Sequence, residues 1–143
     1  MAYAKARKLK LTDAAYIAGL IDGEGTITLT REHANENRRL VVSISNTELP
    51  ILHFVREVCG IGKITSKRIY SDRHTPSYVY KITNRQALAL LDQIAHYLQS
   101  YKSARAKLAL KEYLLRTSRN GRYTTEQYKA RRHFEKKFLE IVP

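Results

Sequence analysis

The sequence is poor in the residues that define several large classes of protein. It has one cysteine, Cys59, so no disulfide framework can form within the chain. Its apolar stretches are far too short to span a bilayer, and its N-terminal residues are basic instead of signal-like. We therefore expect an intracellular protein, in the cytoplasm, the nucleoid or an organelle matrix, with no membrane partner and with Cys59 reduced in the core.

Acidic residues are also scarce, which sets the electrostatics of the chain. There are 13 Asp and Glu against 26 Lys and Arg, a formal net charge of +13 and a pI near 10.0. This balance is typical of proteins that bind polyanions, nucleic acid above all. A length of 143 residues with 43% hydrophobic side chains suits one folded domain. A structural protein of the ribosome or of chromatin would carry a similar charge, so that class stays open.

The most informative segment runs from Tyr16 to Gly25 and reads Y-I-A-G-L-I-D-G-E-G. It predicts a buried helix that begins at a cap on Thr12 or Asp13. The helix would end in two carboxylates, where the partial negative charge of a helix C-terminus opposes them. A divalent metal is the simplest cation that could offset this charge. Gly19 and Gly23 share a face, where a second helix could approach closely.

The rest of the chain alternates between strand and helix patterns. Alternation with period two predicts strands at residues 26–31, 40–46, 63–68 and 77–82, joined in pairs as antiparallel hairpins. Residues 78, 80 and 82 share one face of the last strand, and we expect that face to lie in the core.

Helices are expected after each hairpin. The first has Asn46 or Thr47 as its cap and Gly60 as its stop, and the second has Asn84 as its cap and an apolar stripe that reaches Leu98. The order is helix, two strands, helix, two strands, helix.

The last third of the chain is strongly basic. Residues 101–143 hold 12 Lys or Arg and 4 Asp or Glu. Thr124 and Gln127 form a capping box for a last helix, whose Tyr128, Phe134 and Phe138 should pack on the domain. Its basic residues are candidates for phosphate contact, with a solvated helix face as the alternative. They are Lys129, Arg131, Arg132, Lys136 and Lys137.

Residues 17–25 resemble the nine-residue signature of the LAGLIDADG homing endonucleases, with Ile17, Gly23 and Glu24 as substitutions. The resemblance covers roughly residues 12–115 and implies an α+β class, the αββαββα homing endonuclease fold. This fold has a four-stranded antiparallel sheet shaped as a saddle, with helices on one face, here followed by C-terminal helices. We divide the chain into a basic N-terminal segment (1–11), the endonuclease domain (12–115), and a basic loop and C-terminal helix (116–143).

The resemblance also implies an active site. In the family the second acid of the motif is the catalytic carboxylate that binds metal, so this role passes to Glu24, with the Gly23 carbonyl as a further ligand of Mg²⁺ or another divalent metal such as Mn²⁺. Residues 96–106 are similar to a segment that carries the active-site lysine, here Lys102. Asn46 aligns with a polar active-site position. The family's nearby arginine has no counterpart.

One copy of the motif implies a homodimer, with Ala18, Gly19, Asp22 and Gly23 at the interface. The implied activity is intron homing by a metal-dependent DNA endonuclease, a phosphodiester hydrolase that makes a double-strand break at a long, near-palindromic site. The alternatives are an RNA maturase that binds intron RNA and a DNA-binding protein that does not cleave.

The wet face of the sheet is the expected surface for double-stranded DNA, since a two-stranded ribbon fits the major groove. For any single residue, a solvated strand position is the alternative. The strand candidates are Thr26, Thr28, Thr30, Arg39, Ser43, Lys63, Thr65 and Lys67. The loop candidates are Arg68, Tyr70, Arg73 and His74 near the second hairpin tip, and Arg116, Arg119 and Arg122 before the last helix.

Overall fold

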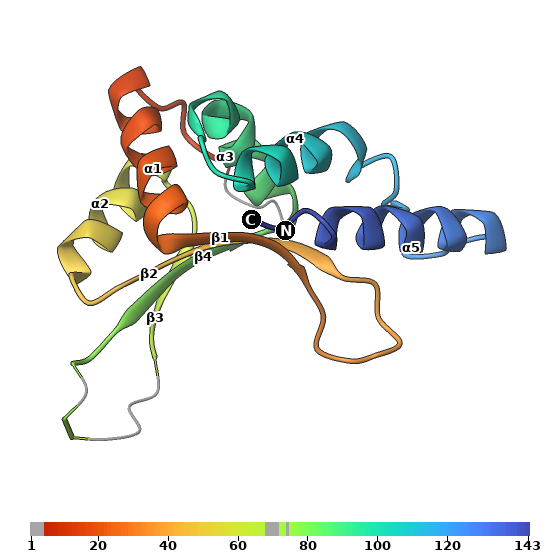
Figure 1. Ribbon diagram of the computed structural model, residues 1–143, viewed down its shortest axis with the longest axis horizontal. Helices are drawn as coiled ribbons and strands as arrows, with labels where there is room; N and C mark the ends of the chain where they lie inside the picture. Colours follow the sequence, from red (N-terminus) through yellow and green to blue (C-terminus); the bar gives the residue numbers. More distant parts are fainter. Residues whose placement is uncertain (1–4, 68–71, 74) are drawn as a thin grey trace.

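A four-stranded antiparallel sheet with the strand order β1-β2-β4-β3 forms the base of the molecule (Figure 1). The computed structural model describes residues 5–67, 72–73 and 75–143. The strands are β1 (Gly25–Thr30), β2 (Arg39–Asn46), β3 (Lys63–Ser66) and β4 (Tyr78–Thr83). The helices are α1 (Leu11–Glu24), α2 (Leu49–Cys59), α3 (Asn84–Ile94), the 3₁₀ turn η1 (Ala95–Tyr97), α4 (Lys102–Glu112) and α5 (Thr125–Leu139).

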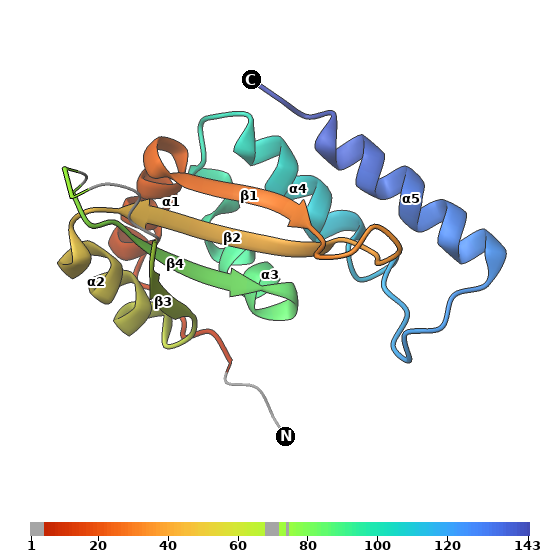
Figure 2. The ribbon, with the colours of Figure 1, turned by 90° about the horizontal axis from the view of Figure 1, so that it is seen from below.

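The helices α1 to α4 cover one face of the curved sheet and leave the other face open (Figure 1). The β1–β2 hairpin loop extends toward the open side (Figure 1), and α5 lies beyond the β1 edge (Figure 2). This arrangement confirms the predicted αββαββα order and the saddle with helices on one face. No helix within the described ranges is long and apolar enough to cross a membrane.

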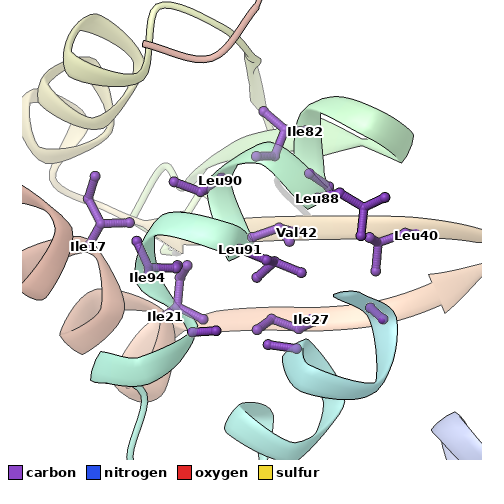
Figure 3. Packing of buried hydrophobic residues seen from close by; sticks show 14 of the residues in the cluster. Ile17, Ile21, Ile27, Leu40, Val42, Ile82, Leu88, Leu90, Leu91 and Ile94 are labelled. Carbon is purple, nitrogen blue, oxygen red and sulfur yellow. The ribbon is translucent and has the colours of Figure 1, made fainter. Parts of the chain in front are cut away.

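The core lies between the sheet and the helices, as Figure 3 shows for Ile27 and Val42 against Ile21 and Leu91. The core residues alternate along the strands as the sequence predicts, although in β2 Val41 is buried as well as its neighbours Leu40 and Val42. Tyr80 is completely buried, and its hydroxyl donates to the Ile61 carbonyl at 2.7 Å. The tyrosine face of β4 is therefore the core face. Cys59 is also buried, in agreement with the sequence.

The predicted helix caps are the main errors at the level of secondary structure. α1 begins at Leu11 with no side-chain cap, so neither Thr12 nor Asp13 caps it. α2 begins after Glu48, whose backbone N–H donates to the Asn46 side chain at 2.8 Å. Asn84 is the first residue of α3 instead of its cap, with φ 54°, and its side chain accepts from the Tyr113 hydroxyl.

The remaining helix boundaries lie closer to the predicted ones. α2 ends where Gly60 takes a left-handed conformation with φ 69°, as predicted. α3 stops at Ile94, and a 3₁₀ turn replaces the last part of its expected stripe. The capping box of α5 is present, with bonds of 3.1 Å and 2.9 Å between Thr124 and Gln127. Phe134 and Phe138 are buried as expected, whereas Tyr128 is exposed.

Candidate functional site

The acidic turn of the motif lies where α1 passes directly into β1. Gly25 follows the last residue of α1 and is already paired with Ile44 of β2. Its position tolerates no side chain, because a Cβ there would come within 2.6 Å of the Ile21 Cα and 3.0 Å of the Ser43 carbonyl. The tight junction fixes Asp22, Gly23 and Glu24 at one end of the sheet.

Asp22 anchors the segment that leads into α4. Its carboxylate accepts bonds from the Gln99 N–H at 2.8 Å, the Ser100 N–H at 3.1 Å and the Ser100 hydroxyl at 2.5 Å. Burial by itself would raise the pKa of Asp22. The hydrogen bonds from Ser100 and Gln99, together with the Lys102 charge, outweigh it and leave the pKa below its ordinary value of 3.8. Asp22 therefore has partners within its own protomer.

Lys102 supplies the cation that the C-terminus of α1 requires. Its Nζ donates to the Ile21 carbonyl at 2.7 Å and to the Asp22 carbonyl at 3.0 Å, and the residue is only 9% exposed. Burial lowers the pKa of Lys102, and the Asp22 and Glu24 carboxylates partly oppose this. The cation at the helix end is thus a lysine from α4, where the charge argument from sequence suggested a metal ion.

Replacing Asp22 by Asn tests this anchor. We expect the free energy of unfolding at pH 7 to fall by about 1.5 kcal/mol, because hydrogen bonds to a charged group are lost from a partly exposed site. A carboxyl whose folded-state pKa is lowered stabilises the protein above its unfolded pKa, and this contribution disappears as the pH falls through the folded pKa. Urea unfolding from pH 7 to pH 3 should show the difference narrowing below about pH 4. A constant difference would contradict the anchor.

Glu24 differs from Asp22 in having no such partners. It is exposed, and it makes no hydrogen bond or ion pair with any residue that the structure describes. A carboxylate together with the Gly23 carbonyl is the oxygen chemistry that Mg²⁺ prefers. Within the described part of one protomer, no three or more His, Cys, Asp and Glu gather into a potential metal site. The donors fit a hard cation in kind, and two protomers would supply more of them.

The remaining predicted catalytic residue is at the same end of the sheet. Asn46 ends β2, and β2 pairs with β1 so that Ile44 faces Gly25. The Asn46 Oδ1 is occupied by the Glu48 N–H, which leaves its amide nitrogen as a donor. The fold thus brings Glu24, Lys102 and Asn46 to one end of the sheet from three separate elements.

The predicted dimer interface is only partly available. Ala18 is completely buried within its own protomer, so its inclusion was wrong. Gly19 and Gly23 are exposed on the outer face of α1, and a Cβ at either position would meet nothing within 4 Å.

The open face of the sheet carries the predicted strand residues. Thr26 and Thr28 of β1, Ser43 of β2 and Lys63 and Thr65 of β3 all alternate with core residues. Arg39 forms an ion pair with Glu32 at 3.8 Å. Register also places Lys81 on this face, opposite Lys63, although the predicted set omitted it. Thr30 is the last residue of β1, Lys67 follows the end of β3, and Arg73 is exposed. Arg68, Tyr70 and His74 lie outside the described residues.

The basic loop and α5 divide into exposed and structural arginines. Arg119 and Arg122 are exposed, whereas Arg116 makes an ion pair with Glu112 at 3.6 Å. Arg131 is 2% exposed and forms an ion pair with Glu135 at 3.0 Å, so the suggested phosphate contact of Arg131 was wrong. Helical spacing did not reveal this partnership, because charged residues at this spacing occur on solvated faces as well.

The profile of the LAGLIDADG-like domain family matches residues 12–95, more than half of the chain. The protein therefore belongs to this family.

Solved structures show the same fold. The homing endonuclease I-CvuI, in complex with its target in the presence of Ca, is 17% identical with a TM-score of 0.73, over 92% of this chain and 83% of I-CvuI. The archaeal intron-encoded homing endonuclease I-Vdi141I, complexed with DNA, is 17% identical with a TM-score of 0.62, over 92% of this chain and 85% of the other. The meganuclease I-SmaMI, bound to DNA, matches 86% of this chain but only 43% of its own length, at 18% identity and a TM-score of 0.63.

Proposed function

We propose that this protein is a site-specific DNA endonuclease that acts as a homodimer and makes a metal-dependent double-strand break at a long, near-palindromic site. The observation that carries the proposal is Glu24, an exposed carboxylate with no hydrogen bond or ion pair to the described residues, fixed at the junction of α1 and β1 in a chain of the LAGLIDADG-like family. The structures of similar fold that are bound to DNA support DNA as the substrate. A double-stranded DNA substrate supports an intracellular site of action, which is part of the proposal.

The outer face of α1 supports a two-fold dimer. Gly19 and Gly23 each cost a helix about 1 kcal/mol relative to Ala, and the protomer's own packing does not require either of them. Their place beside Ala15, also exposed, makes a strip of small residues on which a second α1 could lie closely. Two such helices would bring two Glu24 side chains together, and a two-fold dimer favours a palindromic site. The I-SmaMI chain, of which this chain matches less than half, is compatible with one protomer forming half of the machinery.

Each protomer contributes three kinds of group to the reaction. The Glu24 carboxylate and the Gly23 carbonyl would hold a divalent cation, Mg²⁺ or Mn²⁺, which when bound activates water and neutralises the leaving oxygen. Lys102 holds the backbone of the acidic turn through two carbonyls and keeps a positive charge beside it, where it would offset charge on the phosphate. The Asn46 amide nitrogen would orient water at the same end of the sheet.

RNA remains the alternative substrate. A basic surface would suit RNA as well as DNA, so the choice of DNA depends on the fold and on Glu24, not on charge. The test is to incubate the purified protein with a randomised double-stranded DNA library, with Mg²⁺ or with a chelator, and to sequence the cut ends. We expect cutting with Mg²⁺ at one long, near-palindromic site. Absence of cutting, together with retention of RNA but not DNA in a parallel binding selection, would move the assignment to a maturase.

Replacing Gly19 by Leu tests the dimer. The side chain has room in the protomer, so folding should be kept while the approach of a second helix is blocked. Light scattering should give twice the chain mass of 16.5 kDa for the wild type and a single chain mass for Gly19→Leu. Ala104→Leu, at an exposed position of α4, is the matched control and should remain dimeric. A monomeric wild type would overturn the two-fold proposal.

A further inference from the structure

One line of side chains crosses the open face of the sheet from edge to edge. In the observed register Thr26 of β1 faces Ser43 of β2, Ser43 faces Lys81 of β4, and Lys81 faces Lys63 of β3. We call these four residues the lysine row. Each strand supplies one member, and all four point away from the core, because their neighbours along each strand are the core residues.

The two lysines of this row do not stabilise the sheet. They are direct partners across an antiparallel pair, where like charges repel. Both are exposed, and neither has a hydrogen bond or ion pair with a residue that the structure describes. This pairing of charges does not stabilise the fold. It would favour binding of a ligand whose surface carries strong negative potential.

The rows on either side carry no charge. Two residues along the strands in one direction lie Thr28, Val41 and Thr83, and in the other direction lie Ser45, Val79 and Thr65. Two strand residues span about 7 Å, which equals the rise of about two base pairs. A sheet lying along the major groove would therefore present paired positive charge to one position, with neutral rows about two base pairs away on both sides.

The positions of Lys81 and Lys63 within the sheet indicate which of them would contact bases and which would contact phosphates. Lys81 is on β4, an interior strand flanked by β2 and β3, whereas Lys63 is on the edge strand β3. The middle of a sheet in the major groove meets base edges, and its rims approach the backbone. Guanine presents two acceptors there, O6 and N7, which lysine binds.

We propose that Lys81 is a specificity-determining residue that selects guanine at one position of each DNA half-site, with Lys63 beside it strengthening the local positive potential. This inference depends on the proposed DNA-binding function but not on cleavage. The lysine row gives each protomer one charged site for base recognition. In the two-fold dimer, the second protomer makes the same contact in the other half-site, on the opposite DNA strand.

The test is selection of bound duplexes from a randomised library without Mg²⁺, followed by sequencing, for the wild type and Lys81→Met. The wild type should prefer guanine at one position per half-site, and Lys81→Met should lose this preference by roughly 5- to 150-fold while the other positions keep theirs. Lys107→Met, exposed on α4 over the other face of the sheet, is the matched control and should leave the whole profile unchanged.

Other outcomes overturn the proposal in distinguishable ways. Uniformly weaker binding by Lys81→Met, with a salt slope reduced by about one, would make Lys81 a phosphate contact. An unchanged profile would mean that Lys81 does not contact DNA. A lower thermal stability of Lys81→Met without DNA would show that Lys81 serves the fold, because removal of a like-charge pair should leave stability equal or higher. A wild type without any base preference would refute the proposed function itself.

Discussion

Glu24→Gln is expected to reduce DNA cleavage about a thousand-fold or more while leaving DNA affinity and stability nearly unchanged. The amide keeps the shape of the side chain but loses the charge that would hold a divalent cation, and such a cation supplies several kcal/mol of charge stabilisation in a transition state. Glu24 has no ion pair or hydrogen bond with the described residues, so its neutralisation breaks no contact there. Single-turnover cleavage of the selected site in Mg²⁺ measures the effect.

The matched control for this change is Glu140→Gln, another exposed glutamate, which lies at the end of α5. It removes the same charge from the protein and should cleave at the wild-type rate. Equal loss in both variants would attribute the effect to net charge, and full activity of Glu24→Gln would remove the proposed metal site.

Arg131→Met should lower the free energy of unfolding by about 3–5 kcal/mol, the largest stability effect that we expect from one substitution. Arg131 packs against the Tyr113 and Phe134 rings, with its guanidinium carbon 4.9 Å and 5.7 Å from their centroids. It donates to Glu135 at 3.0 Å and to the Thr117 hydroxyl at 2.8 Å. Its removal would leave Glu135, only 3% exposed, as a buried charge without its closest ion-pair partner.

Denaturant unfolding measures this loss. Lys136→Met, an exposed position of the same helix, is the control and should change stability by less than about 0.5 kcal/mol. The double variant Arg131→Met with Glu135→Leu should recover much of the loss, because it removes both buried charges. A cost below about 1 kcal/mol for Arg131→Met, or no recovery in the double variant, would contradict the buried network.

The same network explains why α5 matters to the open face of the sheet. Arg131 also donates to the Arg38 carbonyl, and the Arg38 N–H donates to Glu135 at 3.2 Å. Arg38 is the last residue before β2, at the end of the β1–β2 hairpin loop. A helix outside the matched family segment thereby holds one of the two hairpins that flank the open face.

Local patterns in the sequence predict most of the fold, because alternation and helical stripes are imposed by the core that each element faces. The alternation with period two predicts the four strands and the tyrosine face of β4. Gly60 predicts the end of α2, because glycine readily takes the left-handed conformation found there. The helix starts were less predictable, since tertiary contacts compete for the capping side chain. Asn84, for example, bonds with Tyr113, 29 residues away in sequence.

The candidate site, like the fold, could be predicted from the sequence only in part. Glu24 is recognisable from its motif. In contrast, Asp22 and Lys102 bond with partners that are 77 to 81 residues away in the sequence. No local pattern encodes these contacts. Lys81 required the strand register, because only pairing shows that it faces Lys63. Arg131 looked like a surface cation until the fold placed Glu135 and two aromatic rings around it.

The most direct test of the central claim is to map the cuts that the wild-type protein makes on both strands of its selected site, with Mg²⁺ and with a chelator. We expect one cut per strand, placed symmetrically about the centre of the site, in Mg²⁺ only. Cuts that persist in the chelator, or that fall on a single strand, would contradict a two-fold endonuclease with a metal at Glu24.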